Sequence, residues 1–280
     1  MKYGIYLPNY GEELSALALA DLAGEAEKAG WDGFFLWDHI LGSKSQKVRI
    51  LDPWIALTAM AMQTERIRLG TTVTPLARRR PWKLARETVT LDILSGGRLT
   101  LSVGLGEPQK VEFEMFGEDG DPKVRAARLD EGLEVLIGLW KGKPFSFHGQ
   151  YYHVSKMTFL PTPAQSPRIP IWVGGFWSNK PPFRRAARFD GVIPLKKEGW
   201  LTPEDVKMIL EFILHHRKDQ TPFDIAVIGS WNTERMKGIK GAKKVEIYAQ
   251  AGATWWLESF YMQRNSNEKL RTRIRQGIPY

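Results

Sequence analysis

Eight short apolar runs alternate with longer amphipathic stretches in this 280-residue sequence, and this alternation constrains the fold more than any other feature. The runs are Tyr3–Leu7, Gly33–Trp37, Ile67–Val73, Leu99–Val103, Ile169–Val173, Gly191–Pro194, Phe223–Ile228 and Thr254–Glu258. Short apolar runs of this kind are typical of buried strands. Strands that alternate with helices usually pair in parallel, so the pattern predicts an α/β protein with a (β/α)8 barrel.

The amphipathic stretches indicate where the helices lie. Leu129 and Leu133 are four residues apart, which places them on one face of a helix. Pro53 and Pro81 precede similar stretches, and proline is well tolerated in the first turn of a helix. No linker or internal repeat divides the chain, so we expect one barrel domain over residues 1–280.

Some connections are longer than a minimal barrel needs, and we expect loop insertions at Ile40–Leu51, Pro108–Pro122 and Lys141–Pro167. The first two follow the second and fourth strands, so they should border the mouth of the barrel, where barrel enzymes hold their active sites. The third contains PFSFHGQYYHV, which indicates a hairpin with a structural role. We expect the first two insertions and the loop Ser230–Gly241 to determine the substrate.

The net charge of +9 raises the question of nucleic-acid binding. Basic residues are mostly scattered among acidic ones, with clusters at Arg78–Arg80 and Arg264–Arg275. No RNA-binding aromatic signature or zinc-finger spacing accompanies them, so solvated helix faces or a phosphate pocket explain them better than a nucleic acid. His215 and His216 are adjacent on an expected helix and point about 100° apart; we expect no metal site.

Composition and the order of residues exclude several other classes of protein. The sequence has no cysteine, which excludes disulfides and thiolate chemistry. It has no apolar run of membrane-spanning length, and its first residues reach charge and proline too soon for a signal peptide. We therefore expect a cytoplasmic protein that does not bind a membrane.

Polar residues and glycines follow three of the strands, at Asp38-His39, Thr71–Thr74 and Gly104–Glu107. A histidine at a strand end can transfer a proton near neutral pH, and a neighbouring carboxylate can orient it. From the residues alone, a structural histidine that caps a loop is the preferred interpretation of His39. Gly104 and Gly106 permit a close approach of the backbone to a ligand. The segment is not a dinucleotide-binding fingerprint, because Gln109 stands at the position of its third glycine.

Several segments together carry a family resemblance: AEKAGWDGFFLWDH, TERIRLGTTVTPLARRRPWKLARE, LDILSGGRLTLSVGLG, RLDEGLEVLIGLW, PRIPIWVGG and GATWWLE. Over nearly its whole length the chain resembles the bacterial luciferase-like flavin monooxygenases and F420-dependent oxidoreductases. The resemblance implies a (β/α)8 barrel with loop insertions that forms a homodimer. It agrees with the strand count, which does not depend on it.

The resemblance also implies roles for residues at the barrel mouth. His39 would be the catalytic residue that faces the cofactor, with Asp38 beside it. The Thr72–Val73 bond would be a non-prolyl cis peptide under the cofactor ring, and Gly104 and Gly106 would lie at the ring edge.

Two further sites follow from the resemblance. Glu107 would be a proton donor, although Pro108 departs from many relatives and a solvated loop glutamate explains Glu107 equally well. Gly174, Gly175 and Ser178 would bind the cofactor phosphate at the start of a helix; a turn that needs the torsional freedom of glycine is the alternative.

The preferred function from this resemblance is a monooxygenase that uses reduced FMN and O2 on a small organic substrate. A flavin reductase would supply the reduced FMN. The alternative is an F420-dependent oxidoreductase, in which His39 is the base and Glu107 the acid for hydride transfer. A non-catalytic flavin-binding protein is a third hypothesis, because a fold does not fix a function.

Overall fold

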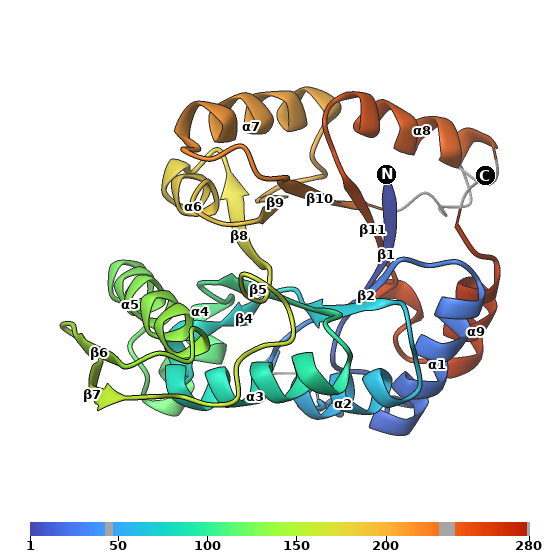
Figure 1. Ribbon diagram of the computed structural model, residues 1–280. Helices are drawn as coiled ribbons and strands as arrows, with labels where there is room; N and C mark the ends of the chain where they lie inside the picture. Colours follow the sequence, from blue (N-terminus) through green and yellow to red (C-terminus); the bar gives the residue numbers. More distant parts are fainter. Residues whose placement is uncertain (43–46, 230–238, 279–280) are drawn as a thin grey trace.

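The computed structural model describes residues 1–42, 47–229 and 239–278, and within them eight parallel strands close into a barrel (Figure 1). The barrel strands are β1 (Lys2–Leu7), β2 (Gly33–Leu36), β3 (Arg68–Thr71), β5 (Leu99–Gly104), β8 (Ile171–Trp177), β9 (Gly191–Lys196), β10 (Asp224–Gly229) and β11 (Trp255–Ser259). Pairing of β3 with β5 closes the barrel. Each expected run overlaps one of these strands, so the predicted (β/α)8 fold is confirmed.

Helices follow the strands and surround the barrel (Figure 1). The main ones are α1 (Ala16–Lys28), α2 (Pro53–Met62), α3 (Pro81–Leu94), α5 (Pro122–Trp140), α6 (Lys180–Ala186), α7 (Pro203–His216), α8 (Ile239–Gln250) and α9 (Asn267–Arg275). Local sequence explains several of their starts. The Asp52 and Asp121 side chains accept hydrogen bonds from backbone N–H groups at the starts of α2 and α5, each followed by a proline.

The insertions lie where the sequence predicts excursions from the barrel. Pro108–Pro122 contains the short helix α4 (Gln109–Glu112) and the 3-10 turn Glu114–Phe116. Lys141–Pro167 contains the antiparallel hairpin of β6 (Phe145–His148) and β7 (His153–Met157). Residues 43–46 and 230–238 lie outside the described residues, and with them lies most of the loop expected to help determine the substrate.

Large aromatic side chains fill the barrel interior. Phe35 stacks on Trp172 with ring centroids 5.4 Å apart, and Trp172 meets Trp255 edge to face at 5.5 Å. Glycines leave the space for these rings. A Cβ on Gly33 of β2 would lie 2.5 Å from the Phe35 ring, and a Cβ on Gly191 of β9 would lie 2.4 Å from the Trp172 ring. Trp256, the next residue of β11, belongs instead to the core between barrel and helices, as strand alternation requires.

A second layer of buried residues separates the barrel from its helices. It contains Leu19 and Leu22 of α1, Leu84 of α3 and Leu133 of α5, all at most 1% exposed. No helix in the described ranges has both the length and the apolar content that crossing a membrane requires. The eight strands are therefore packed on both faces, inside the barrel and against the helices, and this packing holds their carboxyl ends in place.

Closure of the barrel predicts the effect of one substitution. Gly70 of β3 pairs with Thr100 of β5, and a Cβ on Gly70 would lie 2.3 Å from the Thr100 backbone oxygen. Because a backbone atom cannot swing aside, Gly70→Ala should lower the free energy of unfolding by about 1–3 kcal/mol in urea denaturation. The matched control is Gly24→Ala in α1, where the nearest atom is 3.4 Å away on the flexible Gln63 side chain. Equal effects of the two substitutions would contradict this account of closure.

Candidate active site

The carboxyl ends of β2, β3, β5 and β8 open into a cavity of about 940 Å³. The predicted site residues that line it are Asp38, His39, Thr72, Val73, Gly104, Gly106, Glu107, Gly174 and Gly175. Ser178 is not among the lining residues. Residues from four separate strand ends therefore meet in one cavity, at the end of the barrel where barrel enzymes carry out their chemistry.

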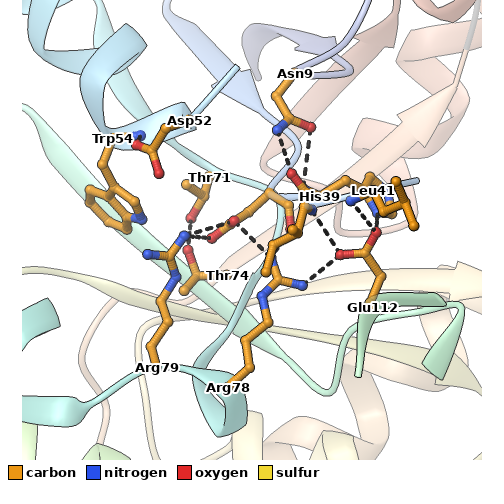
Figure 2. Close-up of polar contacts among 12 residues, drawn as sticks. Asn9, His39, Leu41, Asp52, Trp54, Thr71, Thr74, Arg78, Arg79 and Glu112 are labelled. Carbon is orange, nitrogen blue, oxygen red and sulfur yellow. Dashed lines mark hydrogen bonds and ion pairs between the residues drawn. The ribbon is translucent and has the colours of Figure 1, made fainter. Parts of the chain in front are cut away.

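His39 is held by a carboxylate that the sequence analysis missed. Its Nδ1 atom lies 3.0 Å from Oε1 of Glu112, which belongs to α4 in the insertion after β5 (Figure 2). The Glu112 side chain is 1% exposed, whereas His39 is 18% exposed and lines the cavity. Among the described residues, none forms a hydrogen bond to His39 Nε2. Glu112 thus fixes the orientation of the ring, which lines the cavity.

The protonation state of Glu112 determines the tautomer of His39. Burial would raise the pKa of this carboxyl, but hydrogen bonds from His39 and from the N–H groups of Ile40 and Gly42 outweigh burial and lower the pKa to about 2. An ionised carboxylate only accepts hydrogen bonds. His39 Nδ1 must therefore carry the hydrogen, which leaves the Nε2 lone pair of a neutral ring free to accept a proton.

Two arginines neutralise the buried carboxylates around His39. Arg78 donates to Glu112 Oε2 at 2.7 Å and to Asp38 Oδ1 at 2.9 Å, and Arg79 donates to both Asp38 oxygens at 2.8 and 2.9 Å (Figure 2). Asp38, which was expected to orient His39, pairs with these arginines instead. Their guanidinium groups therefore pair with carboxylates inside the protein, although Arg78 also lines the cavity.

Asn9 fixes the backbone of His39. Its Nδ2 atom donates to the His39 carbonyl at 2.9 Å, and its Oδ1 accepts from the His39 N–H at 3.2 Å (Figure 2). Nδ2 also donates to the Leu51 carbonyl at 2.7 Å. Asn9 is fully buried just beyond the end of β1. Both the backbone and the ring of His39 are therefore constrained before any ligand binds.

The end of β3 forms the floor of the cavity. The Thr72–Val73 peptide bond is cis, as the resemblance implied, and Thr74-Pro75 then pairs with β5 as the short strand β4. Val73 remains partly exposed in the cavity. A Cβ on Gly104 or Gly174 would lie 2.6 or 2.7 Å from the Val73 side chain. These glycines therefore make room for Val73, and the role in cofactor binding predicted for them stays a prediction.

The other two predicted glycines also have protein neighbours. Gly106 has φ of +80°, and a Cβ there would lie 2.7 Å from Pro75. A Cβ on Gly175 would lie 2.3 Å from Pro182 of α6. All four glycines line the cavity, but each is required by the close packing of the segments that shape it.

The structure does not form the phosphate-binding turn that was predicted at Gly174, Gly175 and Ser178. Gly174 and Gly175 lie inside β8, so their placement in a turn before a helix is wrong. Helix α6 begins at Lys180, and the next two residues, Pro181 and Pro182, have no N–H group. The Asn179 N–H already donates to Phe176. The start of this helix therefore offers a phosphate few backbone donors.

Arg185 of α6 is also unavailable to a phosphate, because it pairs with another residue of the protein. It forms a pair with Asp130 of α5, with Nε 2.6 Å from Oδ1. Lys197 does line the cavity, at the end of β9, and its side chain is exposed. Lys197, just after β9, is thus better placed for an anionic group than Arg185 of α6.

Glu107 and Glu112 lie in the same cavity but in different surroundings. Glu107 is exposed at the rim, with Oε1 3.5 Å from Arg125 Nη2. Glu112 is buried and bonded to His39. A signal for Glu112 does exist in the sequence, because it stands between Val111 and Phe113 in an insertion expected to be functional. The sequence does not reveal which glutamate of that insertion reaches His39.

Comparison with known proteins supports the assignment of the fold and shows the family. A family model described as luciferase-like monooxygenase matches residues 1–198. The F420-dependent glucose-6-phosphate dehydrogenase of Nakamurella multipartita is 34% identical over 166 residues, which are 58% of this chain and 48% of that protein. The chain thus spans about half the length of this relative. An uncharacterized protein of Mycobacterium tuberculosis is 30% identical over 80% of this chain and 74% of its own.

Solved structures share the barrel. An F420-dependent secondary alcohol dehydrogenase in complex with an F420-acetone adduct superimposes with a TM-score of 0.80 over 99% of this chain and 98% of that chain, at 17% identity. The monooxygenase RslO1 from Streptomyces bottropensis has a TM-score of 0.70 over 90% of this chain and 78% of its own, at 26% identity. The first likeness concerns the fold alone.

The low pKa of Glu112 predicts a pH dependence of stability. Because the folded-state pKa is about 2 and the ordinary value is 4.5, this carboxylate stabilises the fold fully above pH 4.5 and loses its effect as the pH falls toward 2. Glu112→Gln should therefore cost up to about 3 kcal/mol near neutral pH, and less in acid. Urea unfolding of both proteins at several pH values measures this difference.

Glu114→Gln, two residues away in the same insertion, serves as the control because its side chain is exposed. It should follow the native protein at every pH. A gap between native protein and Glu112→Gln that stays constant from neutral to acid pH would contradict the ionised state of Glu112.

Proposed function

Because the chain belongs to the luciferase-like monooxygenase family, we propose that it is an oxidoreductase that binds the deazaflavin F420 in the barrel mouth and moves a hydride between F420 and a small hydroxyl or carbonyl compound. The family includes enzymes that use F420 and enzymes that use FMN. The geometry around His39 is the observation that favours hydride transfer with F420 over the FMN-dependent oxygenation preferred from the sequence.

The proposal depends mainly on the pair of His39 and Glu112. Removal of hydride from an alcohol carbon leaves a carbonyl only if the hydroxyl proton is taken up at the same time. His39 Nε2 can accept that proton, and the imidazolium that forms is stabilised by Glu112 at 3.0 Å. Bound F420 would accept the hydride at its C5 position. The reverse reaction returns the proton from His39 to a carbonyl oxygen.

The cavity suits a flat ring system of this kind. Val73, Pro75 and Leu195 provide apolar surface, and His39 and Thr72 add polar groups. Val73 would support the ring, because Gly104 and Gly174 lock it in place from both sides. The chain's contribution is thus to hold the ring on a rigid floor, with a fixed base beside it.

The small number of N–H donors at the start of α6 supports F420 over FMN. A phosphate monoester such as that of FMN carries 1.5 to 2 negative charges at neutral pH. The phosphate of F420 is a diester with one charge. With Pro181 and Pro182 in the first turn of α6, few N–H groups are available there, which is more compatible with the smaller charge. The relative that is 34% identical is also named as an F420-dependent enzyme.

A reduced-FMN monooxygenase is the second candidate function. RslO1, a monooxygenase, is 26% identical and aligned over 90% of this chain. In that case a flavin reductase would supply the reduced cofactor, and the His39 pair would manage proton transfer during oxygenation. A non-catalytic flavin-binding protein is a third hypothesis, which cofactor binding without turnover would support.

Cofactor binding separates these hypotheses. Titration of the purified protein with F420 and with FMN should quench tryptophan fluorescence, because Trp37 lines the cavity. We expect the dissociation constant for F420 to be at least about tenfold lower than that for FMN. Tight FMN binding without F420 binding would reject the proposal and favour the monooxygenase.

His39→Asn tests the base. Asparagine keeps a polar side chain of similar size but cannot accept a proton, so kcat should fall by about 10² to 10⁴. The dissociation constant for F420 should change little, because Val73 and the strand ends hold the ring. His148→Asn on the exposed hairpin is the matched control, and it should retain full activity. A His39→Asn protein with native kcat would exclude His39 as the base.

A further inference from the structure

The mouth of the barrel holds a second compartment beside the cofactor cavity, and we propose that it binds the uncharged, apolar body of the substrate. This compartment has a volume of about 610 Å³. It lies over the carboxyl ends of β9, β10, β11 and β1, whereas the cofactor cavity lies mainly over β2, β3, β5 and β8. The proposal depends on the proposed function, because it assigns the substrate class of the same active site.

The two spaces share a wall. Tyr6, Trp37 and Leu195 line both of them, so the compartment adjoins the cofactor cavity along these three residues. The Trp37 ring is 5.4 Å from the His39 ring, measured between centroids. A substrate whose hydroxyl group reaches His39 would therefore extend its remaining atoms past Trp37 into the compartment.

The lining of the compartment is aromatic and aliphatic. Besides the shared wall, it contains Pro194, Lys196, Gly199, Trp200, Leu201, Ile228, Ser259, Tyr261, Met262 and Gln263. Tyr261 stacks on Trp37 with centroids 5.9 Å apart and ring planes 19° from parallel. Trp200 and Met262 are 57% and 79% exposed. Large apolar side chains exposed around a hollow are typical of a binding site for an apolar ligand.

Charge at the compartment argues against an anionic substrate. Lys196 is the one charged residue among the described residues that line it. Its Nζ atom lies 2.6 Å from Oδ2 of Asp205, and that oxygen also accepts hydrogen bonds from Thr202 in the capping box of α7. The lysine is thus neutralised by a carboxylate fixed at the start of the helix. Among the described lining residues, a phosphate or carboxylate would find no unpaired cation, whereas an aliphatic or aromatic secondary alcohol or its ketone would bury apolar surface.

The test is a series of secondary alcohols of increasing apolar size, from 2-propanol to cyclohexanol and 1-phenylethanol, compared with glucose 6-phosphate. With F420 as acceptor, kcat/KM should rise by about fourfold for each buried methylene group. Glucose 6-phosphate should be the poorest substrate. A flat series, or a preference for the sugar phosphate, would overturn the assignment.

Two substitutions locate the effect. Trp200→Ala and Met262→Ala each remove exposed apolar surface from the compartment, so they should reduce the increase in kcat/KM per methylene group. Trp82→Ala is the matched control, because Trp82 is 40% exposed in α3 and lines neither cavity. If the compartment variants keep the native slope, the apolar body of the substrate binds elsewhere.

Calorimetric titration of the cofactor-free protein with the matching ketones separates this proposal from the proposed function. Binding that strengthens with apolar size and is weakened by Trp200→Ala supports the compartment even if F420 does not bind. Tight binding of F420 together with ketone affinities that are independent of size and of Trp200 would keep the function and reject the compartment.

Discussion

The guanidinium group of Arg78, buried between two carboxylates, is the interaction on which the active site depends. It joins Asp38 at the end of β2 to Glu112 in the insertion after β5, and Arg79 completes the neutralisation of Asp38. A buried charge that loses its partner is strongly destabilising. The positions of these strand ends are therefore linked, and His39, which follows Asp38 and bonds to Glu112, is positioned by the same cluster.

The barrel mouth has two halves with different linings. One half has a rigid floor at Val73 and a histidine whose tautomer is fixed by an ionised carboxylate, features suited to a cofactor ring and a proton. The other half is apolar, and its lysine is paired with Asp205. The fold alone does not distinguish hydride transfer from oxygenation, because barrels of this family support both. The arrangement of His39 and Glu112 and the two prolines of α6 are what favour F420 and an alcohol.

Much of the fold could be predicted from the sequence because each strand is a short apolar run that ends at polar or glycine residues. The same logic places His39 near the end of a strand, but its role as the catalytic candidate follows only from the family resemblance. Glu112 was missed because the path of the insertion, and not local pattern, decides which glutamate reaches His39. The end of β8 was misplaced because Gly174 and Gly175 resemble a turn; they stay within the strand because Val73 and Pro182 occupy the space of their missing side chains.

The most direct test of this account is nitrogen-15 NMR of the histidine side chains at a pH where the His39 ring is neutral. The chain has five histidines, so loss of one signal set in His39→Asn assigns the ring. The account predicts that Nδ1 of His39 carries the hydrogen and that Nε2 does not, and that this preference weakens in Glu112→Gln. A native His39 with the hydrogen on Nε2, or a tautomer unchanged by Glu112→Gln, would contradict the claim that buried Glu112 prepares His39 as the base.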